Sequence, residues 1–182
     1  DLFSSVIHHI IGQQISMKAQ QTIWNRMNDL LGHISPKTIS DVAFDQLQAL
    51  GMTYRKAEYI KDFSTKILNR TFDLEAVKKM SDKDAIFALS QLKGIGVWTA
   101  EMILLFCLQR LDVFSYDDLA IHRGLRMVYH HRQVNRSLFE RYRRRFSPYG
   151  SVASLYLWAV SGGAISNMKD FAPKKSRQMK GK

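Results

Sequence analysis

The chain of 182 residues lacks several features that would each indicate a class of protein. Its single cysteine, Cys107, excludes a disulfide within the chain and a four-cysteine iron–sulfur cluster. No apolar run reaches the roughly 20 residues that a helix needs to cross a bilayer, and no signal-peptide pattern opens the chain. We therefore expect a cytoplasmic protein without a membrane contact. Because the sequence starts at Asp1, without an initiator methionine and directly in a helical pattern, we also expect that an N-terminal piece is missing.

A strand pattern is missing as well. No alternation of apolar and polar residues is long enough for a strand, whereas apolar residues recur at intervals of three and four along most of the chain. The sequence therefore predicts an all-α fold of nine or ten helices, without a linker or an internal repeat. The residues expected to start helices are Ser35, Thr53, Asp73, Ser81, Asn135 and Ser147.

Acidic residues are scarce relative to basic ones. The chain has 16 Asp and Glu against 27 Lys and Arg, a formal net charge of +11. Basic residues gather in a tail at 172–182, which we expect to be disordered, and at 132–145. This placement favours a polyanionic partner such as nucleic acid, although composition alone leaves a merely soluble basic protein equally open. The arginines of the second group are Arg132, Arg136, Arg141, Arg143, Arg144 and Arg145.

Two glycines, Gly94 and Gly96, separate an amphipathic stretch at 81–91 from an apolar stretch at 97–108. This spacing predicts two helices joined by a tight turn, which is a helix-hairpin-helix. Glycine allows a positive φ and the close approach of a ligand, and the second helix starts with outward amides and a positive dipole end. Such a turn suits a phosphate group.

The hairpin and the segment DVFSYDDLAIHRG at 112–124 resemble the helix-hairpin-helix (HhH-GPD) DNA glycosylases, in particular bacterial 3-methyladenine glycosylases of the inducible type. The similarity extends to residues 10–16, to residues 51–57 and to Trp158, and so covers nearly the whole chain. It implies a two-lobed helical fold with an active-site cleft between the lobes. The catalytic core would span 1–171, with the hairpin at 82–108.

Asp118, by its position behind the hairpin, resembles the catalytic aspartate of this family. Its simplest interpretation is the N-cap of a helix, and that role is compatible with catalysis because backbone donors orient the carboxylate. Cleavage of an N-glycosidic bond leaves positive charge on the deoxyribose, which a nearby anion stabilises. The same carboxylate would help to orient the attacking water. The neighbouring Asp117 and Asp112 are expected to be structural.

The resemblance also implies a base pocket. Trp98 stands where bifunctional relatives have a lysine that forms a Schiff base, so we expect base hydrolysis without AP lyase activity. Trp98, Trp158 and Tyr149 would line the pocket, where aromatic rings attract the cationic ring of an alkylated purine. Met102 departs from the tyrosine found at its position in a relative, which affects the expected shape of the pocket. Ordinary packing is the alternative for Trp98.

Further residues are expected to contact DNA. The turn with Gln13 and Gln14 resembles the loop that inserts into the base stack when a nucleotide is flipped out; the alternative is that both glutamines only cap helices. The amides near Gly94 and Gly96 would bind phosphates without reading sequence. The remaining predicted DNA contacts are Tyr54, Arg55, Lys56, Lys93 and Thr99.

No cofactor is expected, apart from a structural Na⁺ or K⁺ that the family often holds on hairpin carbonyls, here those of Ser90, Leu92 and Ile95. The six histidines show no ligand spacing for zinc. The sequence thus predicts a monomeric, monofunctional glycosylase, nucleoid-associated if bacterial, that removes 3-methyladenine and 7-methylguanine from double-stranded DNA. Two alternatives stay open: a glycosylase for a deaminated, oxidised or mismatched base, and a non-catalytic module that binds DNA structure.

Overall fold

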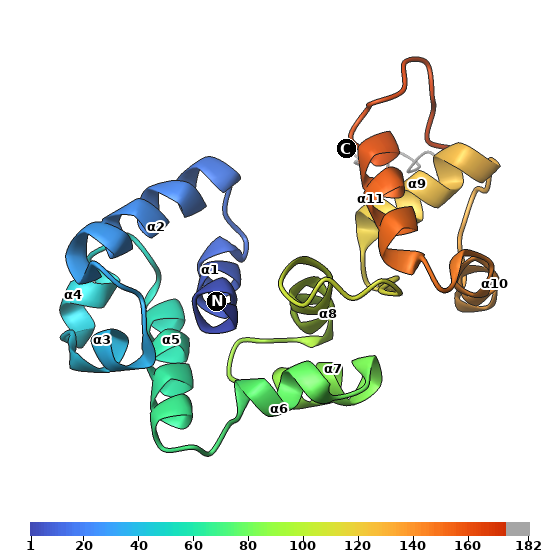
Figure 1. Cartoon of the computed structure of the whole chain (residues 1–182). Helices are drawn as coiled ribbons and strands as arrows, with labels where there is room; N and C mark the ends of the chain where they lie inside the picture. Colours follow the sequence, from blue (N-terminus) through green and yellow to red (C-terminus); the bar gives the residue numbers. More distant parts are fainter. Residues whose placement is uncertain (174–182) are drawn as a thin grey trace, which may run out of the picture. The chain divides into compact units, whose positions relative to one another are not determined.

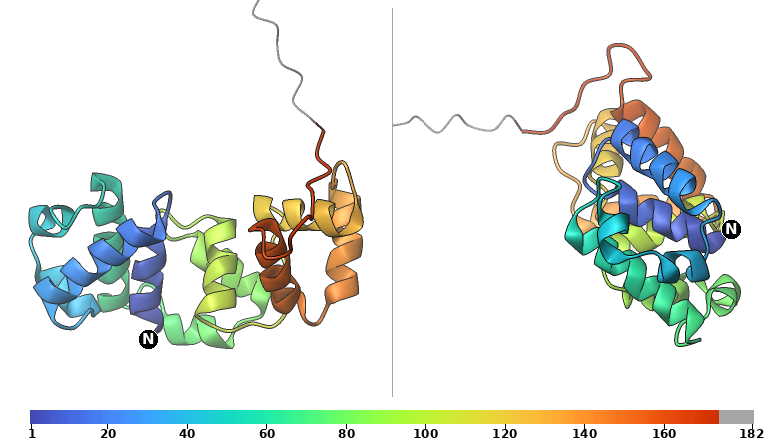
Figure 2. Two further views of the ribbon diagram at one scale, coloured as in Figure 1. Left: turned by 90° about the horizontal axis from the view of Figure 1, so that it is seen from above. Right: turned by 90° about the vertical axis from the view of Figure 1, so that its left-hand side faces the viewer.

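The structure, a computed structural model, describes residues 1–173. Over these residues its regular secondary structure consists of eleven α-helices, with no strand. Loops connect the helices (Figures 1 and 2). The predicted all-α class is confirmed. The helices are α1 Leu2–Gly12, α2 Met17–Leu31, α3 Pro36–Asp41, α4 Phe44–Gln48, α5 Tyr54–Leu68, α6 Leu74–Lys79, α7 Asp82–Ser90, α8 Val97–Phe106, α9 Leu119–Tyr129, α10 Arg136–Phe146 and α11 Gly150–Ser161.

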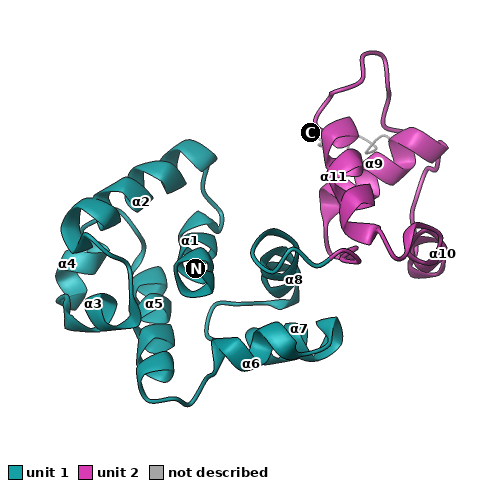
Figure 3. Ribbon diagram, viewed as in Figure 1, with its two compact units in different colours: residues 1–110 teal, residues 111–182 magenta. Residues whose placement is uncertain are grey.

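The chain divides into two compact units, residues 1–110 and residues 111–182 (Figure 3). In the first unit, α1 packs against α2, α5 and α8, while α3 and α4 pack against α5 and α7 packs against α8. Phe3 of α1 stacks on Phe63 of α5 with ring centroids 5.1 Å apart. Helix α1 therefore packs both on α5 and on α8, the second helix of the hairpin.

The second unit is built on the pair α9 and α11. Gly124 of α9 faces Leu157 of α11 so closely that a Cβ at position 124 would lie 2.6 Å from the Leu157 carbonyl oxygen. Glycine is therefore required for this helix contact. The core of this unit consists of Phe114, Ile121, Leu125, Val134, Phe139, Tyr142 and Leu157.

Most of the predicted helix starts are confirmed, because N-cap side chains act over three residues of sequence. Ser35, Thr53 and Asn135 each accept a hydrogen bond from a backbone amide of the first turn of α3, α5 and α10. Asp73 and Ser81 cap α6 and α7 in the same way. None of the helices in residues 1–173 is both long and apolar enough for a bilayer span.

Two expectations are corrected. The described residues form eleven helices rather than nine or ten, because extended backbone at Val42 and Ala43 divides α3 from α4. The last helix begins at Gly150 rather than at Ser147, because the Ser147 hydroxyl donates to Asp112 at 2.6 Å and Asp112 accepts the Gly150 amide at 3.0 Å. Asp112 thus has the structural role expected of it. Most of the basic tail, residues 174–182, lies outside the described residues.

Candidate functional site

The hairpin turn is held by buried residues on either side of its first glycine. Leu92 and Ile95 are buried, and the Ile95 amide donates to the Leu92 carbonyl at 3.1 Å. Gly94 between them has φ +78°, in the left-handed region. A Cβ at Gly94 would lie 2.1 Å from Cδ2 of Tyr59, on α5. Both its conformation and its surroundings therefore require glycine.

Gly96 has a different role. It is the N-cap of α8 with φ −86°, so its conformation is open to any residue and the expected positive φ occurs only at Gly94. It has no side chain to occupy the amides of the first turn, and a Cβ there would meet nothing within 4 Å. The start of α8 is therefore open to a ligand that approaches the backbone, as an anion does at a helix N-terminus.

Two of the predicted DNA contacts next to the turn are already engaged within the protein. Lys93 forms ion pairs with Glu58 at 3.3 Å and with Asp62 at 3.5 Å. The hydrogen bond that Lys93 donates to Glu58, followed by the charge of Asp62, raises the pKa of Lys93. The Thr99 side chain is buried, and its hydroxyl oxygen accepts from Nε2 of Gln13 at 3.5 Å. A contact of Thr99 with DNA is therefore restricted to its backbone.

The turn between α1 and α2 separates the two predicted wedge residues. Gln14 is exposed and has φ +57°, in the left-handed region. Gln13 instead directs its side-chain amide inward, donating to the Gly94 carbonyl at 2.7 Å. We therefore restrict the predicted wedge to Gln14, because the Gln13 amide is bonded to the hairpin.

The three residues predicted from the segment at 54–56 also differ from one another. Tyr54 is 63% exposed with its ring 4.6 Å from that of Phe44, and Arg55 is exposed, so both can reach a ligand. Lys56 is 9% exposed, and its ammonium donates to the carbonyls of Ile11 at 2.8 Å and Gln13 at 2.6 Å. The expectation that Lys56 contacts DNA is corrected, because its charge is used on the C-terminal end of α1.

Trp98 lines a cavity of about 370 Å³ inside the first unit. The cavity lies between the end of α1 and α8, and burial lowers the pKa of both His8 and His9 in its wall. These imidazoles are therefore neutral near pH 7 and add no positive charge. Met102, one turn beyond Trp98, is buried. The full lining is His8, His9, Gly12, Gln13, Gln14, Gln20, Trp98, Thr99 and Phe106.

Asp118 is the N-cap of α9 in the second unit. Its Oδ1 accepts the amides of Ala120 and Ile121, both at 2.9 Å, and the residue is 6% exposed. The neighbouring Asp117 is exposed. The two adjacent carboxylates thus differ as expected, since only Asp118 is both buried and oriented by backbone donors.

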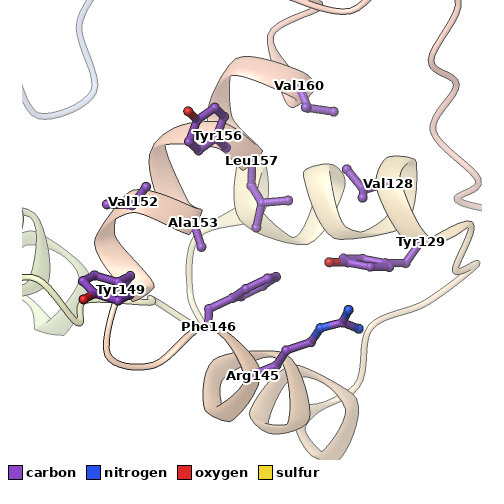
Figure 4. A pocket seen from close by; sticks show the side chains of 10 residues that line it. All are labelled: Val128, Tyr129, Arg145, Phe146, Tyr149, Val152, Ala153, Tyr156, Leu157 and Val160. Atoms are coloured by element: carbon purple, nitrogen blue, oxygen red, sulfur yellow. The ribbon is translucent and has the colours of Figure 1, made fainter.

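The groove of the second unit is lined by one of the other pocket residues expected there, Tyr149. Tyr149, 60% exposed, lines a groove of about 420 Å³ between α11, α9 and α10, with Tyr129, Arg145 and Tyr156 (Figure 4). Neither Asp118 nor Trp158 lines this groove. Trp158 is partly buried against the core of the unit. A pocket shared by Trp98, Trp158 and Asp118 stays a prediction, since Trp98 belongs to the first unit and the other two to the second.

The arginines of α10 are partly neutralised within the unit. Arg136 and Arg143 lie 2.9 and 3.6 Å from Glu140, and the Arg136 guanidinium also lies over the ring of Tyr116 at 4.4 Å. Arg141 and Arg144 are exposed. The helix therefore contributes positive charge to the surface of this unit.

The ligands predicted for a monovalent cation are backbone carbonyl oxygens, which can coordinate Na⁺ and K⁺. The Leu92 carbonyl takes one amide, from Ile95, and a carbonyl oxygen has a second lone pair for an ion. The turn is thus compatible with a structural ion. In the described residues, no group of three or more His, Cys, Asp or Glu side chains could hold a metal.

The geometry of the turn and the capped aspartate agrees with a comparison against known families. Residues 7–148 match the family described as HhH-GPD superfamily base excision DNA repair protein. The chain belongs to this superfamily, as the hairpin and the segment behind it indicated.

Within this superfamily, the chain is similar to proteins named as 3-methyladenine glycosylases. The chain is similar to DNA-3-methyladenine glycosylase 1 of Schizosaccharomyces pombe, with 30% identity over 87% of this chain and 72% of that protein. Its fold is similar to that of a DNA-3-methyladenine glycosidase from Bacillus halodurans, with a TM-score of 0.83 and 31% identity over 94% of this chain and 80% of that one. A structure of the S. pombe 3-methyladenine DNA glycosylase in complex with abasic DNA matches with a TM-score of 0.76 and 30% identity, covering 88% and 81%.

The sequence does not indicate the groups that line the cavity or hold the two turns. No sequence pattern places Tyr59, His8 or His9 at the site, and the pattern at 54–56 predicts a DNA contact for Lys56. Their partners lie far away in sequence: Lys56 is 45 residues from Ile11, and Gln13 is 81 residues from Gly94. The one local indication is the apolar pattern of α5, which places Lys56 on the buried side of the helix.

Proposed function

We propose that this chain is a monofunctional DNA glycosylase that flips alkylated purines out of double-stranded DNA and hydrolyses their N-glycosidic bonds. The observation that carries the proposal is Asp118, a buried carboxylate whose Oδ1 is fixed by two amides at 2.9 Å. A carboxylate held in this way needs little reorganisation to stabilise positive charge that develops on a sugar. Family membership supports the reaction class, and the names of the relatives support the choice of lesion.

In the proposed reaction the C1′–N bond breaks and the base departs with the bonding electron pair. Purines such as 3-methyladenine or 7-methylguanine are cationic, so they leave as neutral bases without a general acid. Asp118 stabilises the oxocarbenium-like sugar and orients the water that adds to C1′. The proton of that water passes to the carboxylate or to solvent.

Substrate choice would follow from the ring of Trp98 and from its surroundings. A desolvated cation over an aromatic face gains about 2 kcal/mol or more, which favours an alkylated purine over a neutral base. Neutral His8 and His9 in the same cavity leave this attraction unopposed by a like charge. Trp98 also replaces the amine that a Schiff base with the sugar would need.

The proposal is tested with duplexes that each carry one defined lesion. We expect the protein to release 3-methyladenine and 7-methylguanine, measured by chromatography, and to leave the abasic strand uncut. Release of only a deaminated, oxidised or mismatched base would replace the proposed substrate, and DNA binding without any release would indicate a non-catalytic module. A covalent adduct after borohydride reduction would contradict the monofunctional assignment. The predicted monomer is tested by the mass from light scattering, which should be that of one chain, 21.0 kDa.

A further inference from the structure

Lys56 is an unusual use of a lysine in this fold. It projects from α5 into the protein, with 9% of its surface exposed, and burial lowers the pKa of its ammonium. The ammonium donates to the carbonyls of Ile11 at 2.8 Å and Gln13 at 2.6 Å, on either side of Gly12. A cation at the end of a helix stabilises its free carbonyls and its dipole. The backbone immediately before Gln14 is thereby fixed.

Gln13 links the same turn to the hairpin. Its side-chain nitrogen donates to the Gly94 carbonyl at 2.7 Å. Gly94 is itself fixed by its left-handed φ of +78° and by the ring of Tyr59. A path of two hydrogen bonds therefore runs from Lys56 through the backbone and side chain of Gln13 to the turn that precedes the amides of α8.

We propose that Lys56 and Gln13 are positioning residues that couple phosphate binding at the hairpin to the insertion of Gln14 into the base stack. The proposal rests on the proposed function, because insertion matters only if a nucleotide is flipped. Unstacking a base costs a few kcal/mol, and an inserted side chain can supply this only if its loop does not yield. Gln14 is exposed at the tip of the turn, so burial does not hold it in place. Its position depends instead on the hydrogen bonds that Gln13 makes to Lys56 and Gly94.

A purely structural role is the competing explanation, and the chain contains a matched control for it. Lys61, five residues further along α5, donates to the carbonyls of Ser40 at 3.1 Å and Val42, at the end of α3. Burial lowers the pKa of Lys61 as well, as its largest influence. Lys61 thus has the same chemistry and the same helix of origin, but it supports a turn without a wedge residue.

The experiment compares Lys56→Met, Lys61→Met, Lys56→Arg and Gln13→Met in the full chain. Each variant is mixed with a duplex that has 2-aminopurine beside the target nucleotide, whose fluorescence rises when the stack opens. We expect Lys56→Met and Gln13→Met to slow this unstacking by about 10- to 100-fold, the range that a small misplacement causes. Lys61→Met should leave it unchanged, and Lys56→Arg should restore most of it. Melting temperatures report the structural cost of each change.

A second readout uses a methylated base that is already unpaired in a mismatched bubble. Lys56→Met should release it at the wild-type rate, while release from a fully paired duplex falls with the unstacking rate. The coupling would be overturned if Lys56→Met and Lys61→Met slowed unstacking equally. It would also be overturned if Lys56→Met lowered the rate of base release from the bubble and from the paired duplex by the same factor. If the wild type opens the stack but releases no base, the proposed function fails while the unstacking comparison still decides the coupling. Should Lys56→Met not fold, Gln13→Met decides it in the same way.

Discussion

The two compact units hold their functional groups in opposite ways. In residues 111–182, Asp118 is placed by two amides of its own helix, two and three residues away. In residues 1–110, the hairpin and the wedge turn are placed by side chains from distant parts of the chain, such as Gln13 on Gly94. The carboxylate thus depends on local sequence, whereas the predicted DNA-binding turns depend on tertiary packing. We therefore expect that a mutation at the site in residues 111–182 can remove activity with little effect on folding, more readily than one in residues 1–110.

The largest expected effect comes from Asp118→Ala. Loss of a preorganised charge at the reacting centre should slow base release by about 100- to 1,000-fold. Loss of the N-cap should lower the free energy of unfolding by about 1 kcal/mol. Asn135→Ala is the matched control, because Asn135 caps α10 through the Leu138 amide at 2.9 Å in the same unit. It should lose similar stability in chemical denaturation and keep its rate; an equal loss of rate would make the role of Asp118 structural.

Trp98→Ala should change the choice of base more than the fold, since Trp98 is 44% exposed. Loss of a cation–π contact of about 2 kcal/mol corresponds to roughly a 30-fold loss of preference for a cationic base over a neutral one. The measurement is the ratio of kcat/KM for 7-methylguanine and for a neutral lesion in the same duplex. Trp98→Phe should retain part of the preference, and an unchanged ratio in Trp98→Ala would remove Trp98 from base recognition.

The two hairpin glycines should respond differently to alanine. At Gly96 a methyl group meets nothing within the protein, so Gly96→Ala should fold normally but weaken binding to abasic DNA by about tenfold, the value of one charge-assisted hydrogen bond. At Gly94 the left-handed φ alone costs about 1–2 kcal/mol, before the clash with Tyr59 is added. Fluorescence anisotropy and thermal unfolding of both variants test this. Normal DNA affinity in a folded Gly96→Ala protein would exclude phosphate binding at the start of α8.

The same difference between local and distant contacts decides what could be predicted from the sequence. Asp118 as an N-cap, and the caps Thr53 and Asn135, were predictable because a cap and its amide lie within three residues of each other. The roles of Lys56, Gln13 and Lys93 were not, since their partners are brought together only by packing of α1, α5 and the hairpin. A basic residue in a DNA-binding protein suggests a phosphate contact, and only the fold shows which charges are used internally.

The smallest expected effect concerns Asp170, which ties the segment after α11 to Arg126 of α9 at 2.6 and 2.7 Å. The hydrogen bond from Arg126 is the largest influence and lowers the pKa of Asp170. Its stabilisation is therefore present above pH about 4, the value for an unfolded chain, and is lost as pH falls below it. Asp170→Asn should lower the free energy of unfolding by up to about 1 kcal/mol at pH 7. Lys37→Met, which removes an exposed pair with Asp41, should change it less.

Denaturant titrations of Asp170→Asn and the wild type at pH 7 and near pH 2.5 check the sign. The difference between the two proteins should shrink at the lower pH. A difference that grows on acidification would contradict the lowered pKa.

The most direct test of the central claim is the single-turnover rate of base release by Asp118→Asn on a saturating methylated duplex. Asparagine keeps the side-chain oxygen that caps α9, so fold and DNA affinity should match the wild type while only the negative charge is lost. We predict a rate at least about 100-fold lower with unchanged affinity for abasic DNA. Release at the wild-type rate would contradict the account, because the buried carboxylate would then not stabilise the charge that forms on the sugar.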